Sequence, residues 1–172
     1  DLGYTTGPWE FREKRASDPP AAFGHYITMW RRQPDGSWKF ALDTGVSHPK
    51  PEGGKPGGVE SPPREGARGS PEGGAPTVAD ADLDRRMLLD LDRRLTLEAF
   101  AWVADEAIRF YRPESQPVTG RQAARAALSA RGEAPISRPA GAEISRAGDL
   151  AYTYGTAEQK KPGSAGAPPE RA

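Results

Sequence analysis

The amino-acid sequence predicts an α+β protein in which antiparallel strands pack on helices. Three observations support this fold class. Aromatic and β-branched residues alternate with polar ones in the first 48 residues, which is typical of strands. A segment rich in glycine and proline follows. After it, leucine and methionine recur every four residues, which indicates an amphipathic helix.

The first 48 residues are predicted to form a three-stranded meander. Residues 1–11 alternate as a strand does, and residues 24–32 (GHYITMWRR) and 37–46 (SWKFALDTGV) are rich in aromatic and β-branched residues. The Pro-Asp-Gly sequence at residues 34–36 predicts a turn, because proline presets φ and glycine accepts a positive φ. We therefore expect a long hairpin with one half-buried face.

Residues 49–79 are predicted to be a flexible linker. Residues 49–76 contain seven prolines and eight glycines but no aromatic residue. Such a segment cannot bury enough apolar area to offset its ordering entropy. Residues 160–172 have a similar composition and are expected to form a disordered tail or a truncated loop.

Residues 80–159 are predicted to contain both helices and strands. Leu83, Met87, Leu91 and Leu95 predict the buried stripe of a first helix. A second helix is expected from Thr96 to Val103. The spacing of Thr119-Gly120-Arg121-Gln122 suggests a capping box that opens a third helix ending near Ala130. Three strands are expected in this part of the chain, at residues 107–112, 136–146 (interrupted near Pro139-Ala140-Gly141) and 149–157.

The phrase DLGYTTG at residues 1–7 returns as DLAYTYG at residues 149–155. Five of the seven positions are identical. We interpret the repeat as two tandem copies of one unit, of which this chain contains the closing strands of the first copy and the opening elements of the second. We expect residues 24–46 to join residues 107–157 in one composite domain, with DLAYTYG beside residues 24–32.

The order of the elements in that unit resembles the nuclear-transport-factor-2-like superfamily, in particular its SnoaL-like members. The resemblance rests on AFAWVADEAIRFYRP with VTGRQAARAAL, on AEISRAGDLAYTYG, and on GHYITMWRRQPDGSWKFALDTG. It implies a cone-shaped sheet of the cystatin-like α+β barrel type with an apolar pocket inside. Proteins of similar fold include ketosteroid isomerase, scytalone dehydratase, limonene-epoxide hydrolase and SnoaL-type polyketide cyclases.

Three functions follow from this resemblance. The first is a binding domain for a small apolar molecule. The second is a cofactor-independent isomerase, dehydratase or polyketide-cyclase-like enzyme that works from a carboxylate in its cavity. The third is an association module that forms a homodimer through its sheet. The binding domain is preferred, because no acid–base pair is evident from the sequence alone.

The candidate catalytic residues are Asp43 and His25. A carboxylate in an apolar cone would have a raised pKa and could act as a general base. Asp43 could equally be a solvated carboxylate on the other face of the sheet. His25 and His48 could be acid–base groups, but both are placed near strand ends, where exposed histidines are common.

Aromatic residues on the predicted strands are candidate ligand contacts, because a phenol can hydrogen-bond a carbonyl oxygen. Core packing is the alternative for each of them. Phe100, Trp102, Phe110 and Tyr111 are expected in the core and not in a site. The candidate ligand-binding residues are Tyr4, Tyr26, Trp30, Tyr152 and Tyr154.

Charge and composition argue against several function classes. Lysine and arginine number 24, and so do aspartate and glutamate. The chain therefore has no basic excess for nucleic acid. It contains no cysteine and no cluster with metal-ligand spacing, so we expect neither a metal nor a cofactor. No apolar run has the length of a membrane span.

The beginning of the chain leaves the cellular location open. The sequence starts at Asp1, and its first methionine is Met29. We therefore expect residue 1 to be a processed end or a fragment edge. A signal peptide upstream would make the protein exported, and without one the protein would be cytoplasmic.

Overall fold

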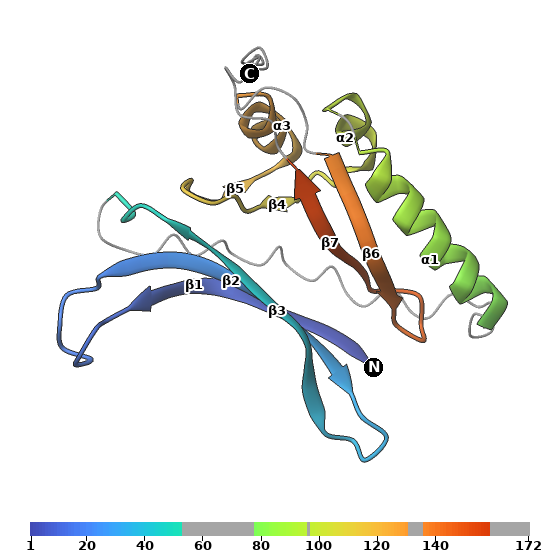
Figure 1. The fold of residues 1–172 in the computed structure, drawn as a ribbon, viewed down its shortest axis with the longest axis horizontal. Coiled ribbons are helices and arrows are strands. Elements are labelled where there is room, and N and C mark those ends of the chain that lie inside the picture. The colour runs from blue at the N-terminus through green and yellow to red at the C-terminus, as the bar shows by residue number, and fades with distance from the viewer. Residues whose placement is uncertain (53–77, 96, 131–135, 159–172) are drawn as a thin grey trace, which may run out of the picture.

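A computed structural model describes residues 1–52, 78–95, 97–130 and 136–158 (Figure 1). The described residues form an α+β structure with antiparallel sheets, as the sequence predicts. The elements in chain order are β1 (Leu2–Phe11), β2 (Ala22–Arg32), β3 (Trp38–His48), α1 (Val78–Arg93), α2 (Leu97–Val103), β4 (Arg109–Phe110), β5 (Val118–Thr119), α3 (Arg121–Ser129), β6 (Ile136–Ile144) and β7 (Ala151–Glu158).

Strands β1, β2 and β3 form an antiparallel sheet with β2 in the middle. The register runs from Leu2 opposite Arg31 to Phe11 opposite Ala22. The β2–β3 hairpin confirms the predicted meander, and its turn contains Gly36 with a φ of 84°. The Asp35 carboxylate accepts hydrogen bonds from the backbone nitrogen and the hydroxyl of Ser37, which lower the pKa of that carboxyl.

Strands β6 and β7 form a second hairpin, and α1 packs along it (Figure 1). The register shifts between Pro139 and Gly141. This shift confirms the interruption expected there, because proline cannot donate to the ladder. The hydroxyl of Thr153 on β7 donates to the carboxylate of Asp92 on α1 at 2.9 Å.

The described core is small and lies between α2, α3 and the short β4–β5 pair. Phe100, Ala104, Ala124 and Leu128 are buried there. The ring of Phe110 meets that of Phe100 edge to face at 5.9 Å between centroids. Trp102, which was also expected in the core, has 88% of its surface exposed. That prediction is wrong, because α2 buries its Phe100 side and leaves Trp102 in solvent.

Two predictions about the helices are also wrong. Leu83, Met87 and Leu91 are exposed, because α1 turns another side to the β6–β7 hairpin, where the hydrogen bond between Asp92 and Thr153 of β7 holds it. The capping box at Thr119 does not form. The residue before α3 is Gly120 with a φ of 96° and no side-chain cap, because the chain bends sharply from β5 into the helix.

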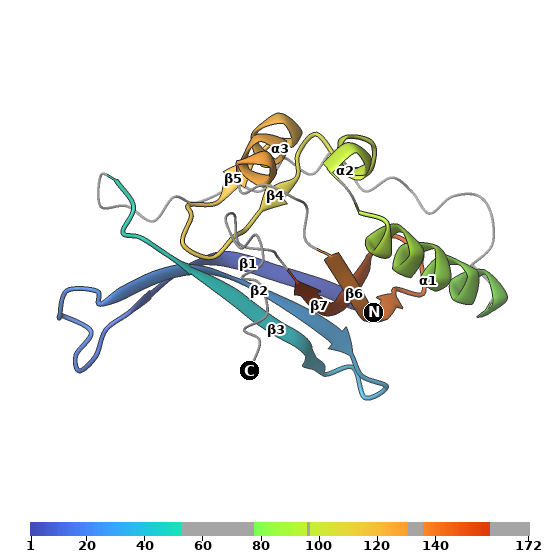
Figure 2. The ribbon, with the colours of Figure 1, turned by 45° about the horizontal axis from the view of Figure 1, so that its top comes forward.

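The chain has an N-terminal part (residues 1–52) and a C-terminal part (the described residues from 78 to 158). These two parts face each other without sharing a sheet. Figure 2 shows α2, α3 and the β4–β5 pair on one side of the β1–β2–β3 sheet. The described strands form three separate sheets and close no barrel. The resemblance-based expectation of one cone-shaped sheet is therefore not confirmed.

The placement expected for the repeated phrase is wrong. DLGYTTG, and not DLAYTYG, lies beside β2, while β7 pairs with β6. The physical reason is local connection. Each copy pairs with the strand to which a short loop joins it.

Most of the predicted linker, at residues 53–77, and the predicted tail lie outside the described residues. Helix α1 begins at Val78, within two residues of the expected boundary. Among the described residues, no helix is long and apolar enough to cross a membrane.

Candidate functional site

A cleft lies between the β1–β2–β3 sheet and residues 107–111, a segment that contains β4. It consists of two cavities of about 290 and 230 Å³. Because both are lined by Ile27, Arg109 and Tyr111, they adjoin each other. The larger cavity is also lined by His25, Thr44, Gly45 and Val46, and the smaller one by Tyr4, Thr6 and Ala107.

The register of the sheet explains why these side chains meet. Ile27 is paired with Thr6 on one side and with Thr44 on the other. Directly opposed residues of antiparallel strands point to the same face. His25 and Val46 are the next pair on that face. The alternation of strand residues therefore places apolar and polar side chains together on the face that looks toward Tyr111.

A buried histidine pair adjoins the larger cavity, which His25 lines. His25 on β2 and His48 at the end of β3 are 2% and 8% exposed. Nδ1 of His25 lies 2.9 Å from Nε2 of His48. His25 is opposite Val46, so His48 is its diagonal neighbour on the same face, within reach of long side chains.

His48 joins the pair to a wider polar network. Its Nδ1 lies 2.8 Å from the carbonyl oxygen of Pro49 and 3.1 Å from the side-chain amide nitrogen of Gln116. The carbonyl oxygen can only accept a hydrogen bond, whereas the amide nitrogen can only donate one, so the two neighbours favour opposite tautomers of His48. Through Gln116, the pair is connected to the loop between β4 and β5.

Tyr111 is held over the sheet by contacts to two strands. Its hydroxyl is 3.1 Å from the hydroxyl of Thr6 on β1. Its ring stacks on that of His25 at 5.5 Å between centroids and 23° between planes. Thr6 in turn donates to the carbonyl oxygen of Tyr26 at 2.6 Å. The phenol therefore has a fixed position at the junction of the two cavities.

Two further contacts tie the chain after Tyr111 to the end of β3. The backbone nitrogen of Glu114 donates to the carbonyl oxygen of Ser47 at 2.8 Å, and Glu114 has a positive φ of 62°. The side-chain amide of Gln116 donates to the carbonyl oxygen of Pro49 at 2.7 Å. These contacts join the loop between β4 and β5 to the sheet, so the cleft has a wall on each side.

Asp43 does not lie in the cleft. It is exposed and stands between Leu42 and the cavity residue Thr44, so it points to the opposite face. Its carboxylate accepts a hydrogen bond from the Thr28 hydroxyl at 2.5 Å. The structure thus gives Asp43 the solvated position that was the alternative to a cavity base.

The five aromatic candidates are divided among three places. Tyr4 lines the smaller cavity. Tyr26 covers Gly7, and Trp30 donates from its indole nitrogen to Thr5, both on the face that carries Asp43. Tyr152 and Tyr154 lie on β7 with ring centroids 6.3 Å apart, away from the cleft.

Three cleft features were not expected from the sequence. Tyr111 was assigned to the core, Arg109 was not considered, and the two histidines were not paired. The histidine pair had a signal, because counting back from the turn at residues 34–36 places His25 and His48 near each other. Arg109 and Tyr111 had none, since only the tertiary structure brings them to the sheet.

The described residues contain no group of three or more histidine, aspartate or glutamate side chains that could hold a metal ion. We compared the chain with protein-family models, with curated proteins and with solved structures, and found no match.

Proposed function

We propose that this chain binds a small, mainly apolar molecule in the cleft beside Tyr111. One observation carries the proposal. Apolar walls from Ile27 and Val46 stand next to the convergent polar groups of His25 and Tyr111 in two adjoining cavities. Pockets that bind small molecules typically combine such walls with a few fixed polar groups. The resemblance to SnoaL-like proteins supports the same class of ligand.

The polar groups suggest what the ligand carries. The Thr6 hydroxyl donates its proton to the carbonyl oxygen of Tyr26, so it accepts from the Tyr111 hydroxyl, whose oxygen is left as an acceptor for a ligand. Thr6 and the stacked ring of His25 fix the position of this oxygen, and fixed polar groups reduce the ordering cost of binding. We therefore propose a ligand with an apolar ring system and at least one hydroxyl or N–H group.

The test is a cavity-filling substitution with a matched control. A set of small cyclic hydroxyketones and phenols is screened by saturation-transfer NMR. Thr44→Phe places a large ring inside the larger cavity, whereas Lys39→Phe changes an exposed residue of the same strand outside both cavities. We expect Thr44→Phe to abolish binding of the hits and Lys39→Phe to retain it. Binding that survives Thr44→Phe, or no hits at all, would contradict the proposal.

Acid–base catalysis on the bound molecule is a second candidate. The observation that favours it is the buried His25–His48 pair beside the larger cavity, because a neutral imidazole can accept a proton. Such a base could remove a proton next to a carbonyl group. We expect His25→Gln to stop deuterium exchange into a bound cyclic ketone, with Asp43→Asn as the unaffected control. Equal exchange in both variants would exclude His25 as the base.

Association through the sheet is a third proposal. Trp38 and Phe40 near the start of β3 are 48% and 69% exposed, and Trp30 packs edge to face on Phe40. An exposed aromatic group of this kind is compatible with a partner surface. Sedimentation velocity of the wild type and of Phe40→Ser tests this proposal. A dimer that forms through this face should dissociate in the variant, whereas a dimer through another face should not.

A further inference from the structure

A charged cavity of about 470 Å³ lies where the two parts of the chain meet, separate from the cleft beside Tyr111. Arg31 and Arg32 reach it from the end of β2, Arg85 from α1, and Arg146 from the turn between β6 and β7. These arginines come from three segments that are distant in the sequence. Only the tertiary structure brings them together.

The cavity has a local excess of positive charge in a chain whose formal net charge is zero. Its lining contains four arginines but only two carboxylates, those of Asp1 and Glu143. Glu143 is paired with Arg31, and Asp1 lies 3.3 Å from Nε of Arg146. Neither of these two lining carboxylates is paired with Arg32 or Arg85. The carboxylate partner of Arg85 is Asp82, which lies on the same helix and outside the lining.

The ion pairs leave donors on the arginines. The ion pair of Arg31, of Arg85 and of Arg146 with its carboxylate uses one guanidinium nitrogen, whereas a guanidinium has five N–H donors. The hydrogen bond from Arg31 to Glu143 raises the pKa of that guanidinium, so Arg31 stays charged. A cavity lined by one excess sign of charge concentrates counter-ions of the opposite sign.

We propose that this cavity binds a small anion with a phosphate group. Guanidinium groups match phosphate oxygens in bidentate geometry, and several of them around one phosphate neutralise its two charges. The cavity volume falls within the roughly 300–1,000 Å³ typical of small-molecule sites, so a phosphomonoester or a diphosphate fits it. Arg32 contributes charge that the two lining carboxylates leave unbalanced, and Arg85, although paired with Asp82, contributes further N–H donors.

Anion binding at this place also stabilises the contact between the two parts of the chain. The arginines on β2 and those on α1 and the β6–β7 turn line one cavity only when the parts are in contact. A ligand that binds only this arrangement stabilises it by mass action. Thermal unfolding therefore gives a second readout besides binding.

The experiment is isothermal titration calorimetry with sodium pyrophosphate, accompanied by thermal unfolding at matched ionic strength. The binding variant is the double substitution Arg32→Gln with Arg85→Gln, which leaves the Arg31–Glu143 and Arg146–Asp1 pairs intact. The control is Arg86→Gln, an exposed residue next to Arg85 outside the cavity lining. Sodium citrate tests whether a carboxylate anion binds as well as a phosphate anion. Sodium chloride tests whether the effect is only the screening of charges by salt.

We expect pyrophosphate to bind and to raise the melting temperature of the wild type and of Arg86→Gln. The double variant should bind at least about tenfold more weakly, because two of four guanidinium groups are lost. Citrate that binds as tightly as pyrophosphate would overturn the assignment to phosphate. A melting temperature that responds equally to chloride, or equal binding by the double variant, would overturn the site itself.

Discussion

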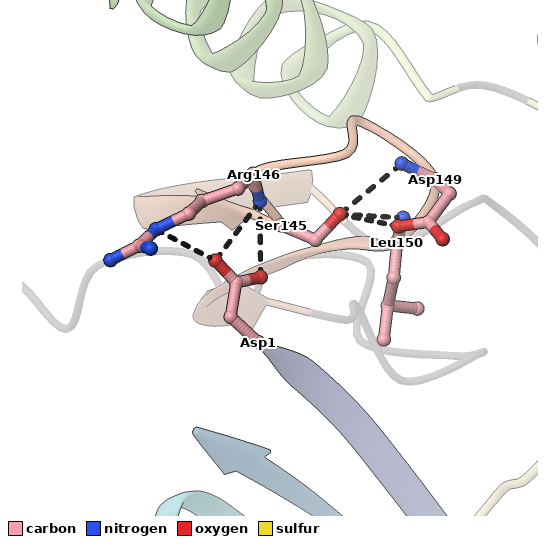
Figure 3. Close-up of polar contacts among 5 residues, drawn as sticks. All are labelled: Asp1, Ser145, Arg146, Asp149 and Leu150. Atoms are coloured by element: carbon pink, nitrogen blue, oxygen red, sulfur yellow. Dashed lines mark hydrogen bonds and ion pairs between the residues drawn. The ribbon is translucent and has the colours of Figure 1, made fainter. Parts of the chain in front are cut away.

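The carboxylate of Asp1 lies 3.0 Å from the backbone nitrogen of Arg146, which donates to it across the junction of the two parts of the chain (Figure 3). Asp149 occupies the same position in the repeated phrase, and its carboxylate accepts a hydrogen bond from the Ser145 hydroxyl at 2.5 Å. The two equivalent aspartates therefore bind neighbouring residues of one turn. The hydrogen bond from Ser145 lowers the pKa of Asp149.

Replacing Asp1 should weaken the junction measurably. We expect Asp1→Ala to lower the free energy of unfolding by roughly 1 kcal/mol, because it removes a hydrogen bond to a charged acceptor. Arg146→Ala should cost less than about 0.5 kcal/mol, since the Arg146 side chain is 94% exposed and its backbone N–H remains with Asp1. Urea denaturation of both variants checks the order, and a larger loss in Arg146→Ala would contradict it.

Gly24 should not tolerate a side chain. A Cβ atom there would collide with the Trp9 ring and with the carbonyl oxygen of Val46. Because backbone and a packed ring would have to move, we expect Gly24→Ala to cost roughly 1–3 kcal/mol or more. Gly3→Ala is the matched control, since its Cβ comes no closer than 3.7 Å to the Trp38 ring. Equal melting temperatures for the two variants would disprove this packing.

The core between α2 and α3 should carry most of the stability of the helical part. Phe100 is 4% exposed, so we expect Phe100→Ala to cost about 3–5 kcal/mol. Met87 belongs to the exposed side of α1, and Met87→Ala should change the unfolding free energy by less than about 0.5 kcal/mol. Chemical denaturation followed by circular dichroism checks this. A large loss in Met87→Ala would mean that the predicted apolar stripe of α1 is buried after all.

Tyr152 should titrate at higher pH than an ordinary tyrosine. Burial raises the pKa of Tyr152 above the usual 10.0, and the nearby Glu143 adds to the effect. The folded state thus disfavours the phenolate. Its contribution to stability is complete below pH 10 and is lost as the pH rises through the higher folded-state pKa.

The measurement compares the wild type with Tyr152→Phe. We expect the difference spectrum at 295 nm to show one late-titrating tyrosine that is missing in the variant. Above pH 10, the wild type should lose stability faster than Tyr152→Phe, because the unfolded phenol ionises freely. Identical titration curves, or a faster loss in the variant, would contradict the placement of Tyr152 beside Glu143.

Local structure was largely predictable because it depends on short-range pattern. The meander of β1–β3, the turn at residues 34–36 and the interruption of β6 near Pro139 all follow from residues close in sequence. The prediction of a buried apolar stripe on α1 is wrong, because periodicity identifies an apolar stripe without identifying what covers it. Within the candidate site, only Tyr4 and His25 were named beforehand as site residues that line the cleft.

The sequence by itself determined the α+β class, the strand pairing within each hairpin and the repeated phrase. These follow from the alternation of side chains and from short connections between strands. Only the tertiary structure decided that Tyr111 stacks on His25 and that four arginines line one cavity. The physical reason is that such contacts join residues far apart in the chain, and no local spacing specifies which distant surfaces meet.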